Sequence, residues 1–104
     1  MKAEDIHGRN AQTLQNARFA VLPLGSFEYH GPHSHYGTDV ILAGGFAGQI
    51  DAKLGGVVYP TVPYTACPGK TARYPGTISI RPSIIQDYLI DIVEGILRNG
   101  ISNI

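Results

Sequence analysis

The sequence has little of what marks several common classes of protein. It holds a single cysteine, Cys67, which excludes an internal disulfide and fits a reducing compartment. Eight basic residues balance eight acidic ones without forming a basic stripe, so nucleic-acid binding has no support. No apolar run approaches the roughly 18 residues that span a bilayer. The segment Met1–His7 has no apolar core and is therefore not a signal peptide. We expect a cytoplasmic protein with neither a membrane nor a nucleic-acid partner.

What is present is a globular composition arranged in short apolar runs. At 104 residues, 43% of them apolar, the chain is at most one domain. Three short runs bounded by turn residues predict strands: Arg18–Leu24, Val57–Val62 and Thr77–Ile80. A long loop, rich in proline, glycine and threonine, separates the last two.

Helical periodicity occupies the stretches between these runs. Three segments are predicted to be helical: Ile6–Ala17, Val40–Leu54 and Pro82–Leu97. The second has Thr38 or Asp39 where an N-cap belongs, and Gly55-Gly56 where a helix ends. The third begins at Pro82, whose missing N–H costs nothing at a first helical position.

The alternation of strands and helices predicts an α/β fold. Parallel strands need cover on both faces, so we expect a mostly parallel sheet flanked by helices in a three-layer αβα arrangement. Ile101–Ile104 resembles the opening of a further strand. The sheet is then incomplete in this chain. We therefore expect residues 1–104 to be a fragment of one larger domain, or a chain whose core a partner completes.

One loop, Gly25–Asp39, concentrates the residues that carry chemistry. Its ligand-type side chains are Glu28, His30, His33, His35 and Asp39. The loop follows a predicted buried strand, which is where open α/β sheets place their active sites. Imidazole nitrogens and carboxylate oxygens suit Zn²⁺ or Mn²⁺. The loop therefore predicts a metal site, most simply a hydrolytic one, against the alternative of a polar loop in which Asp39 only caps the helix.

The residue types and their spacing in this loop form a specific pattern. Its motifs are Pro23-Leu24-Gly25-Ser26, Glu28-Tyr29-His30-Gly31-Pro32-His33 and Gly37-Thr38-Asp39, and Tyr74-Pro75-Gly76-Thr77 follows later in the chain. This succession resembles the creatininase family of creatinine amidohydrolases, in which a strand, a Glu-x-His-Gly-Pro-His loop and a Gly-Thr-Asp helix start follow one another. The resemblance covers Arg18–Ile104 and implies the N-terminal portion of a creatininase-like domain.

The resemblance implies a dinuclear metal centre with Zn²⁺, Mn²⁺ or both. Glu28 would bind one ion, His30 the other, and Asp39 would bridge them. The remaining ligands of the family lie in an Asn-Gly-His segment and a later carboxylate, neither of which this sequence contains. His33 or His35 would form a hydrogen bond to one of these ligands or transfer a proton. The resemblance also implies a homo-oligomer, often a hexamer.

The long loop departs from the family pattern. Arg73 stands near a position where family members often have histidine, and with Lys70 it would suit an anionic or strongly polar substrate group. The expected reaction is hydrolysis of a C–N bond in a small, often cyclic amide. A formamide, a carbocyclic ketone, or a non-catalytic metal-binding or assembly module are the alternatives. Cys67 has no histidine partner placed by sequence, so we expect a loop or partly buried thiol rather than a nucleophile.

Overall fold

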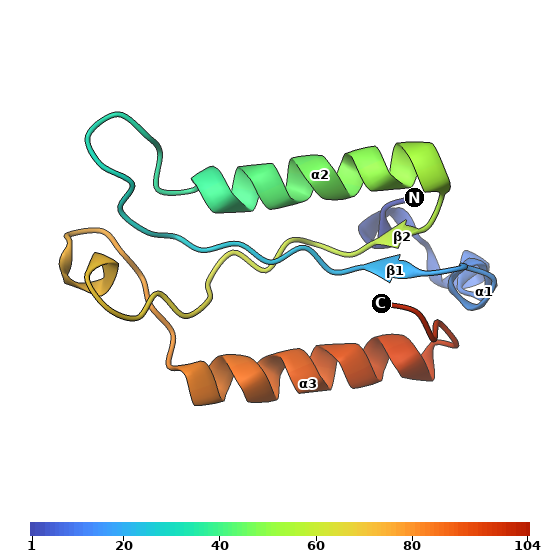
Figure 1. Cartoon of the computed structure of the whole chain (residues 1–104). Helices are drawn as coiled ribbons and strands as arrows, with labels where there is room; N and C mark the ends of the chain where they lie inside the picture. The colour runs from blue at the N-terminus through green and yellow to red at the C-terminus, as the bar shows by residue number, and fades with distance from the viewer.

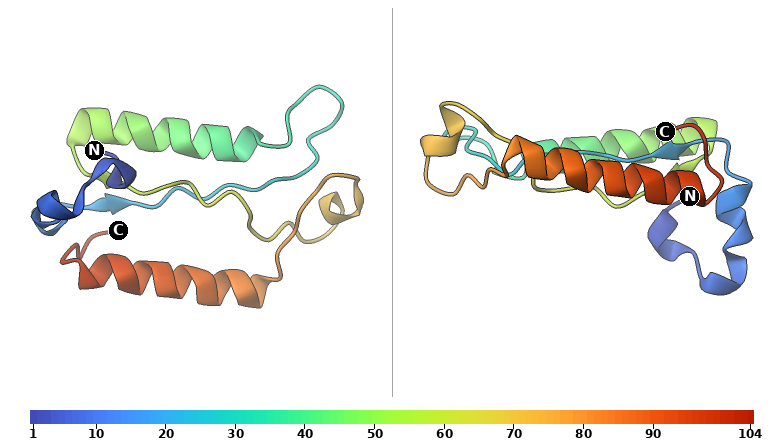
Figure 2. Two further views of the ribbon diagram at one scale, coloured as in Figure 1. Left: turned by 180° about the vertical axis from the view of Figure 1, so that it is seen from behind. Right: turned by 90° about the horizontal axis from the view of Figure 1, so that it is seen from below.

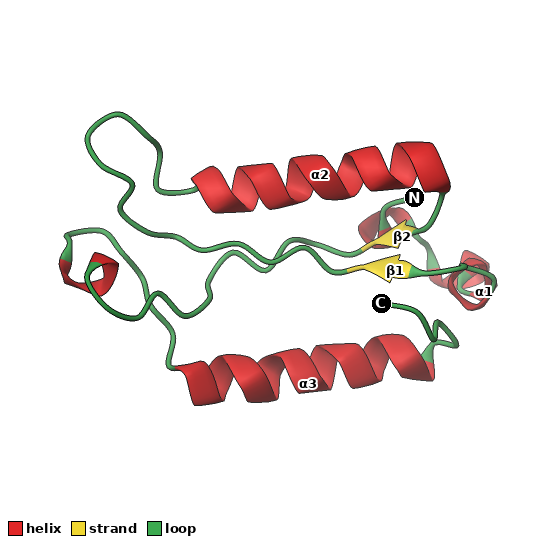
Figure 3. Ribbon diagram, viewed as in Figure 1, coloured by secondary structure: helices red, strands yellow, loops and turns green.

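The computed structural model describes all 104 residues, and a pair of short parallel strands lies at its centre. β1 (Ala20–Val21) pairs with β2 (Val57–Val58), and the two segments stay together as far as an isolated parallel bridge between Leu24 and Val62 (Figure 3). Pro23 interrupts the ladder because proline has no N–H to donate. The predicted strands are therefore paired, but regular only over two residues each.

Two long helices cover the paired segments from opposite sides (Figures 1 and 2). α2 (Thr38–Leu54) connects β1 to β2, and α3 (Pro82–Arg98) follows the long loop. Their arrangement confirms the predicted α/β fold with helices on both sides of a parallel pair. Gly55 ends α2 with a φ of 65°, and Pro82 occupies the first turn of α3, as their positions in the sequence predicted.

Four local predictions need correction. The helix predicted over Ile6–Ala17 is only one α-helical turn, α1 (Gln12–Gln15), preceded by 3-10 turns at Ala3–Asp5 and Gly8–Asn10. Thr77–Ile80 contributes one antiparallel bridge, between Ile78 and Phe27, instead of a strand. The N-cap of α2 is Gly37, one residue before the predicted Thr38 or Asp39. Ile101–Ile104 forms no regular strand, although the carbonyl of Asn103 accepts a hydrogen bond from the N–H of Ala20 at 2.8 Å.

The core is small and lies between β1, β2 and the end of α3. Its buried side chains are Ala20, Val57, Ile96 and Ile101. Ile101 is fully buried, so the C-terminal segment packs into the core beside β1. Most apolar side chains of α2 are exposed instead: Ile41, Phe46 and Leu54 have 66%, 60% and 64% of their surface accessible. None of the helices has the length and apolar character that crossing a membrane requires.

The N-terminus binds beside β2, and this contact predicts how the stability of the fold depends on pH. The Met1 ammonium forms an ion pair with Asp51 and donates a hydrogen bond to the carbonyl of Gly56 at 3.1 Å. The hydrogen bond from that ammonium lowers the pKa of Asp51 below its ordinary value of 3.8. A carboxyl with a lowered pKa stabilises the fold above its unfolded pKa, and loses that contribution as the pH falls through the folded value.

We expect Asp51→Asn to melt at a lower temperature than the parent chain near pH 6, and the gap to close below about pH 4. Thermal melts at both pH values measure the gap. Asp91→Asn, at an exposed carboxylate of α3 without an ion pair, is the matched control and should show no such gap. A gap for Asp51→Asn that is the same at both pH values would contradict the assignment.

Candidate metal centre

The close approach of two backbone segments places the candidate site. The chain leaves the strand pair at Gly25 and returns to the same point at the first turn of α2. An ideal Cβ on Gly25 would lie 2.6 Å from the Cα of Val40, which is closer than any side chain tolerates. Glycine therefore allows the strand exit to touch the start of the helix, and this brings Ser26 against Asp39.

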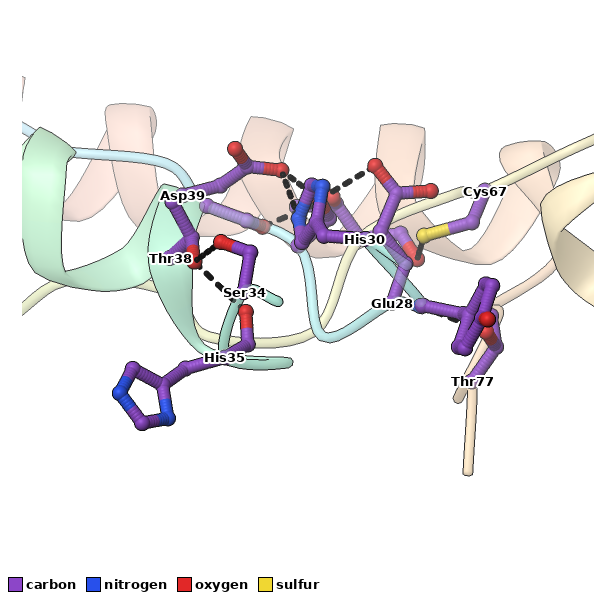
Figure 4. A network of polar contacts seen from close by, with 12 residues as sticks. Glu28, His30, Ser34, His35, Thr38, Asp39, Cys67 and Thr77 are labelled. Atoms are coloured by element: carbon purple, nitrogen blue, oxygen red, sulfur yellow. Dashed lines mark hydrogen bonds and ion pairs between the residues drawn. The ribbon is translucent and has the colours of Figure 1, made fainter. Parts of the chain in front are cut away.

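Three ligand-type side chains converge at this point. Glu28, His30 and Asp39 each offer one ligand atom, and these atoms all lie within 4.8 Å of one another (Figure 4). The Oγ of Ser26 lies 2.5 Å from the Oδ2 of Asp39 and 3.3 Å from the Oε1 of Glu28. One hydroxyl has one proton to donate, so Ser26 donates to Asp39, the nearer acceptor.

The unpartnered nitrogen of His30 tests whether this group fits a metal ion. Its Nε2 is buried and makes no hydrogen bond. The Oδ2 of Asp39 is 3.5 Å away, which is too long for a good hydrogen bond. A buried polar atom without a partner is costly, and a cation beside two carboxylates would satisfy it. One imidazole and two carboxylates form the mixed donor set that Zn²⁺ and Mn²⁺ accept, so the residues fit such an ion.

The other predicted site residues lie outside this cluster. His33 is exposed, with its ring folded back over Gly31. His35 is exposed too, and its ring points away from the cluster in Figure 4, while its carbonyl accepts a hydrogen bond from the Thr38 hydroxyl. Arg73 is exposed at the end of a 3-10 turn, Thr71–Arg73, and its guanidinium forms no ion pair.

Cys67 lies beside the cluster, which the sequence did not indicate. The expected loop thiol is a buried one, with 4% of its surface accessible, and Figure 4 shows it next to Glu28. Burial raises the pKa of the thiol, and the negative charge of Glu28 raises it further. Its backbone N–H donates to the Ser79 hydroxyl at 2.9 Å. The Cys67 thiol is therefore held in its protonated form at neutral pH.

Open space adjoins the cluster on the side of α3. A pocket of about 590 Å³ is bordered by Ser26 and Asp39 at one end and by Ile85 and Leu89 of α3 along its side. Leu24 and Leu42 complete much of its apolar lining. Its volume falls within the range that small-molecule sites have.

These features define an αβα protein with a candidate metal centre where the first strand ends. A family model described as creatininase, creatinine amidohydrolase, matches residues 4–104. The chain belongs to the creatininase family.

Three curated relatives are similar in sequence. A 3-dehydro-scyllo-inosose hydrolase of Thermotoga maritima is 29% identical over 86% of this chain. A mycofactocin precursor peptide peptidase of Mycolicibacterium smegmatis is 35% identical over 68% of it, and a creatinine amidohydrolase of Pseudomonas putida is 27% identical over 77%. The matches span 29%, 31% and 32% of these relatives, so the chain corresponds to about a third of their length.

Solved creatininase structures share the fold. A mutant creatininase complexed with creatine superposes with a TM-score of 0.91 at 21% identity, and a manganese form does so with a TM-score of 0.91 at 20%. A mutant of the Zn-Zn type gives 0.89 at 21%. Each superposition covers 98% of this chain and 42% of the other.

Proposed function

We propose that this chain is the N-terminal portion of a metal-dependent hydrolase that cleaves a C–N bond in a small, often cyclic amide. Glu28 and His30 would each bind one divalent cation, Zn²⁺ or Mn²⁺, and Asp39 would bridge the two. The observation that carries the proposal is the convergence of these three side chains around the buried, unpartnered Nε2 of His30. Family membership supports it, because the matched relatives are named as hydrolases or peptidases.

In the proposed reaction, the bound ions and the residues of the chain have different tasks. Two bound divalent cations would polarise a substrate carbonyl and lower the pKa of water, which makes that water nucleophilic near neutral pH. Ser26 holds the Asp39 carboxylate in place through its hydrogen bond. The substrate would approach through the pocket beside Asp39, whose apolar wall of leucine and isoleucine side chains suits a small, weakly hydrated ring.

Two exposed residues are proposed to act on the substrate rather than on the ions. His33 carries its solvent-accessible ring on the ligand-bearing loop, and it would hydrogen-bond to the substrate or pass a proton to it. Arg73 directly precedes Tyr74, whose ring stacks on Tyr29 of that loop. It would contact an anionic or strongly polar group of the substrate.

The rest of the site and the assembly belong to the same proposal. The superposed creatininases are more than twice as long as the matched region, so we assign the remaining metal ligands to the part of the fold that this chain does not span. The exposed apolar side chains of α2 support association into a homo-oligomer such as a hexamer. A cytoplasmic location fits the single free cysteine.

A second candidate reaction is hydrolysis of a carbocyclic ketone. The specific observation in its favour is the relative from Thermotoga maritima, a 3-dehydro-scyllo-inosose hydrolase, which matches 86% of this chain. The same metal-ligand residues would serve this reaction, because it too requires attack on a carbonyl carbon. The substrate distinguishes the two candidates.

Metal content tests the proposal first. We expect the chain, which holds only part of the proposed ligand set, to bind Zn²⁺ or Mn²⁺ weakly and to lose it to a chelator, whereas tight stoichiometric binding would favour a complete metal-binding module. We also expect any longer product of the same gene to hold two ions and to hydrolyse either cyclic amides or cyclic ketones, as followed by NMR. Chelation should abolish turnover, and added metal should restore it. A longer product that binds no metal, or that turns over equally well with chelator, would overturn the proposal.

A further inference from the structure

The segment Tyr74–Thr77, to which the proposed chemistry gives no role, lies against the ligand loop, Gly25–Gly37. The backbone N–H of Tyr29 donates to the Oγ1 of Thr77 at 2.9 Å. The rings of Tyr29 and Tyr74 stack, with centroids 4.5 Å apart and planes 15° from parallel. The hydroxyl of Tyr36 donates to the carbonyl of Pro75 at 2.7 Å. Three of the four residues thus contact the ligand loop directly.

The fourth residue of the segment is Gly76, and only glycine fits this position because the contact is so close. Its φ of 87° lies in the left-handed region that residues with side chains disfavour. An ideal Cβ at this position would lie 2.8 Å from the Cε1 of Tyr36. Glycine therefore satisfies both the turn and the packing of the Tyr36 ring against the segment.

The contacts reach the ligand loop at the residue between two proposed ligands. Tyr29 separates Glu28 from His30, and side chains alternate along an extended stretch, so Tyr29 faces away from them. Figure 4 shows Thr77 on the far side of Glu28 from Asp39. The N–H of Ile78 continues the contact by donating to the carbonyl of Phe27, immediately before Glu28, at 2.9 Å. The Tyr74–Ile78 segment thus binds the stretch that carries Glu28 and His30 on the face opposite their side chains.

We propose that Tyr74–Thr77 is a clamp whose role is to position Glu28 and His30 for metal binding. The inference rests on the proposed metal function and assigns positioning residues to it. The clamp residues touch no ligand atom. They fix the backbone between the two ligands before an ion arrives, so that less ordering accompanies binding. Loss of supporting contacts around metal ligands typically lowers affinity about 10–100-fold.

Thr77 offers the sharpest test, because its hydroxyl can be removed at nearly constant shape. Thr77→Val deletes the acceptor for the Tyr29 N–H, whereas Thr77→Ser keeps it. Thr71→Val makes the same change in the same loop at a threonine whose side chain forms no hydrogen bond, and it is the matched control. We expect Thr77→Val to lower the affinity for Zn²⁺ about tenfold or more in chelator competition. Thr77→Ser and Thr71→Val should bind as the parent chain does.

A second readout needs no metal. Amide hydrogen exchange at Tyr29 and the ring resonances of His30, both followed by NMR in the metal-free chain, should change in Thr77→Val alone. Should this variant fail to fold, Tyr36→Phe gives the same comparison, since it removes only the hydroxyl that bonds to Pro75.

Each outcome of these experiments bears either on the clamp or on the proposed metal function. Faster exchange at Tyr29 with unchanged Zn²⁺ affinity would reduce the clamp to a structural contact and overturn the proposal, and so would a Thr77→Val variant that behaves like Thr71→Val throughout. A parent chain that binds no Zn²⁺ would contradict the proposed metal function instead. The clamp would then be judged on the exchange of Tyr29 and the resonances of His30, which must still distinguish Thr77→Val from Thr77→Ser.

Discussion

Replacing Asp39 by asparagine is expected to lower the affinity of the chain for Zn²⁺ by more than about 100-fold, because losses around a site already cost about 10–100-fold and this change removes a ligand itself. The amide keeps the shape of the carboxylate and can still accept the Ser26 hydroxyl. It lacks the negative charge and the second anionic oxygen that a bridging position between two cations requires. Titration calorimetry and elemental analysis measure the affinity and the number of ions bound.

The control for this substitution is Asp87→Asn, which makes the same change at an exposed carboxylate of α3. It should leave metal binding unaltered. Because Asp39 lies in the first turn of α2, a melting curve of the metal-free variant must accompany the titration. If Asp39→Asn binds as many ions as the parent protein, and with the same affinity, Asp39 is no bridging ligand.

The family resemblance of their motifs, and not their spacing, indicated Glu28, His30 and Asp39 as a set of ligands, and the structure brings one atom of each within 4.8 Å of the others. The helices were predictable from local pattern, because their periodicity and the positions of Pro82 and Gly55 depend on neighbouring residues alone. The structure begins α2 two residues before the predicted Val40, which is the usual uncertainty of a helix end.

Contacts between distant segments were not predictable in the same way. A strand requires a partner along its whole length, and Pro23 removes the N–H that the ladder needs, so the apolar run Arg18–Leu24 forms a ladder over two residues only. Nothing in its spacing places Cys67 beside Glu28, because the long loop that carries it could have folded in many directions. The clamp at Tyr74–Thr77 had a recognisable motif, yet its partner, Tyr29, emerged only from the fold.

The space available for a Cβ differs sharply between the loop glycine and the helix glycines of this chain. Gly25 has no room for a Cβ, since the backbone of Val40 occupies that space. Gly45 and Gly48 in α2 have no atom within 4 Å of an added Cβ. The sequence led us to expect that the helix glycines permit close packing. Gly44 alone among them does so, because an added Cβ would lie 3.2 Å from the Oγ1 of Thr61. The loop glycine therefore matters more for the site than the helix glycines.

We expect Gly25→Ala to destabilise the fold by about 1–3 kcal/mol, the usual cost of forcing extra atoms into a packed position. The clash is with backbone, at 2.6 Å from the Cα and 2.7 Å from the N of Val40, so no side-chain rotation relieves it. The first turn of α2 must move away from the strand exit. Since Asp39 precedes Val40, that movement also separates Asp39 from Ser26 and from the other ligands. Urea denaturation measures the stability, and Zn²⁺ titration of the folded variant measures the site.

Gly48→Ala is the matched control, because it makes the same change at an exposed helical position with open space around it. Alanine is favoured over glycine inside a helix by about 0.5–1 kcal/mol, so this variant should be at least as stable as the parent chain and should bind Zn²⁺ equally well. The two substitutions thus have opposite expected signs. Parent-like stability in Gly25→Ala would mean that the strand exit and the start of α2 are less tightly joined than the structure shows, and the ligand geometry built on that junction would have to be revised.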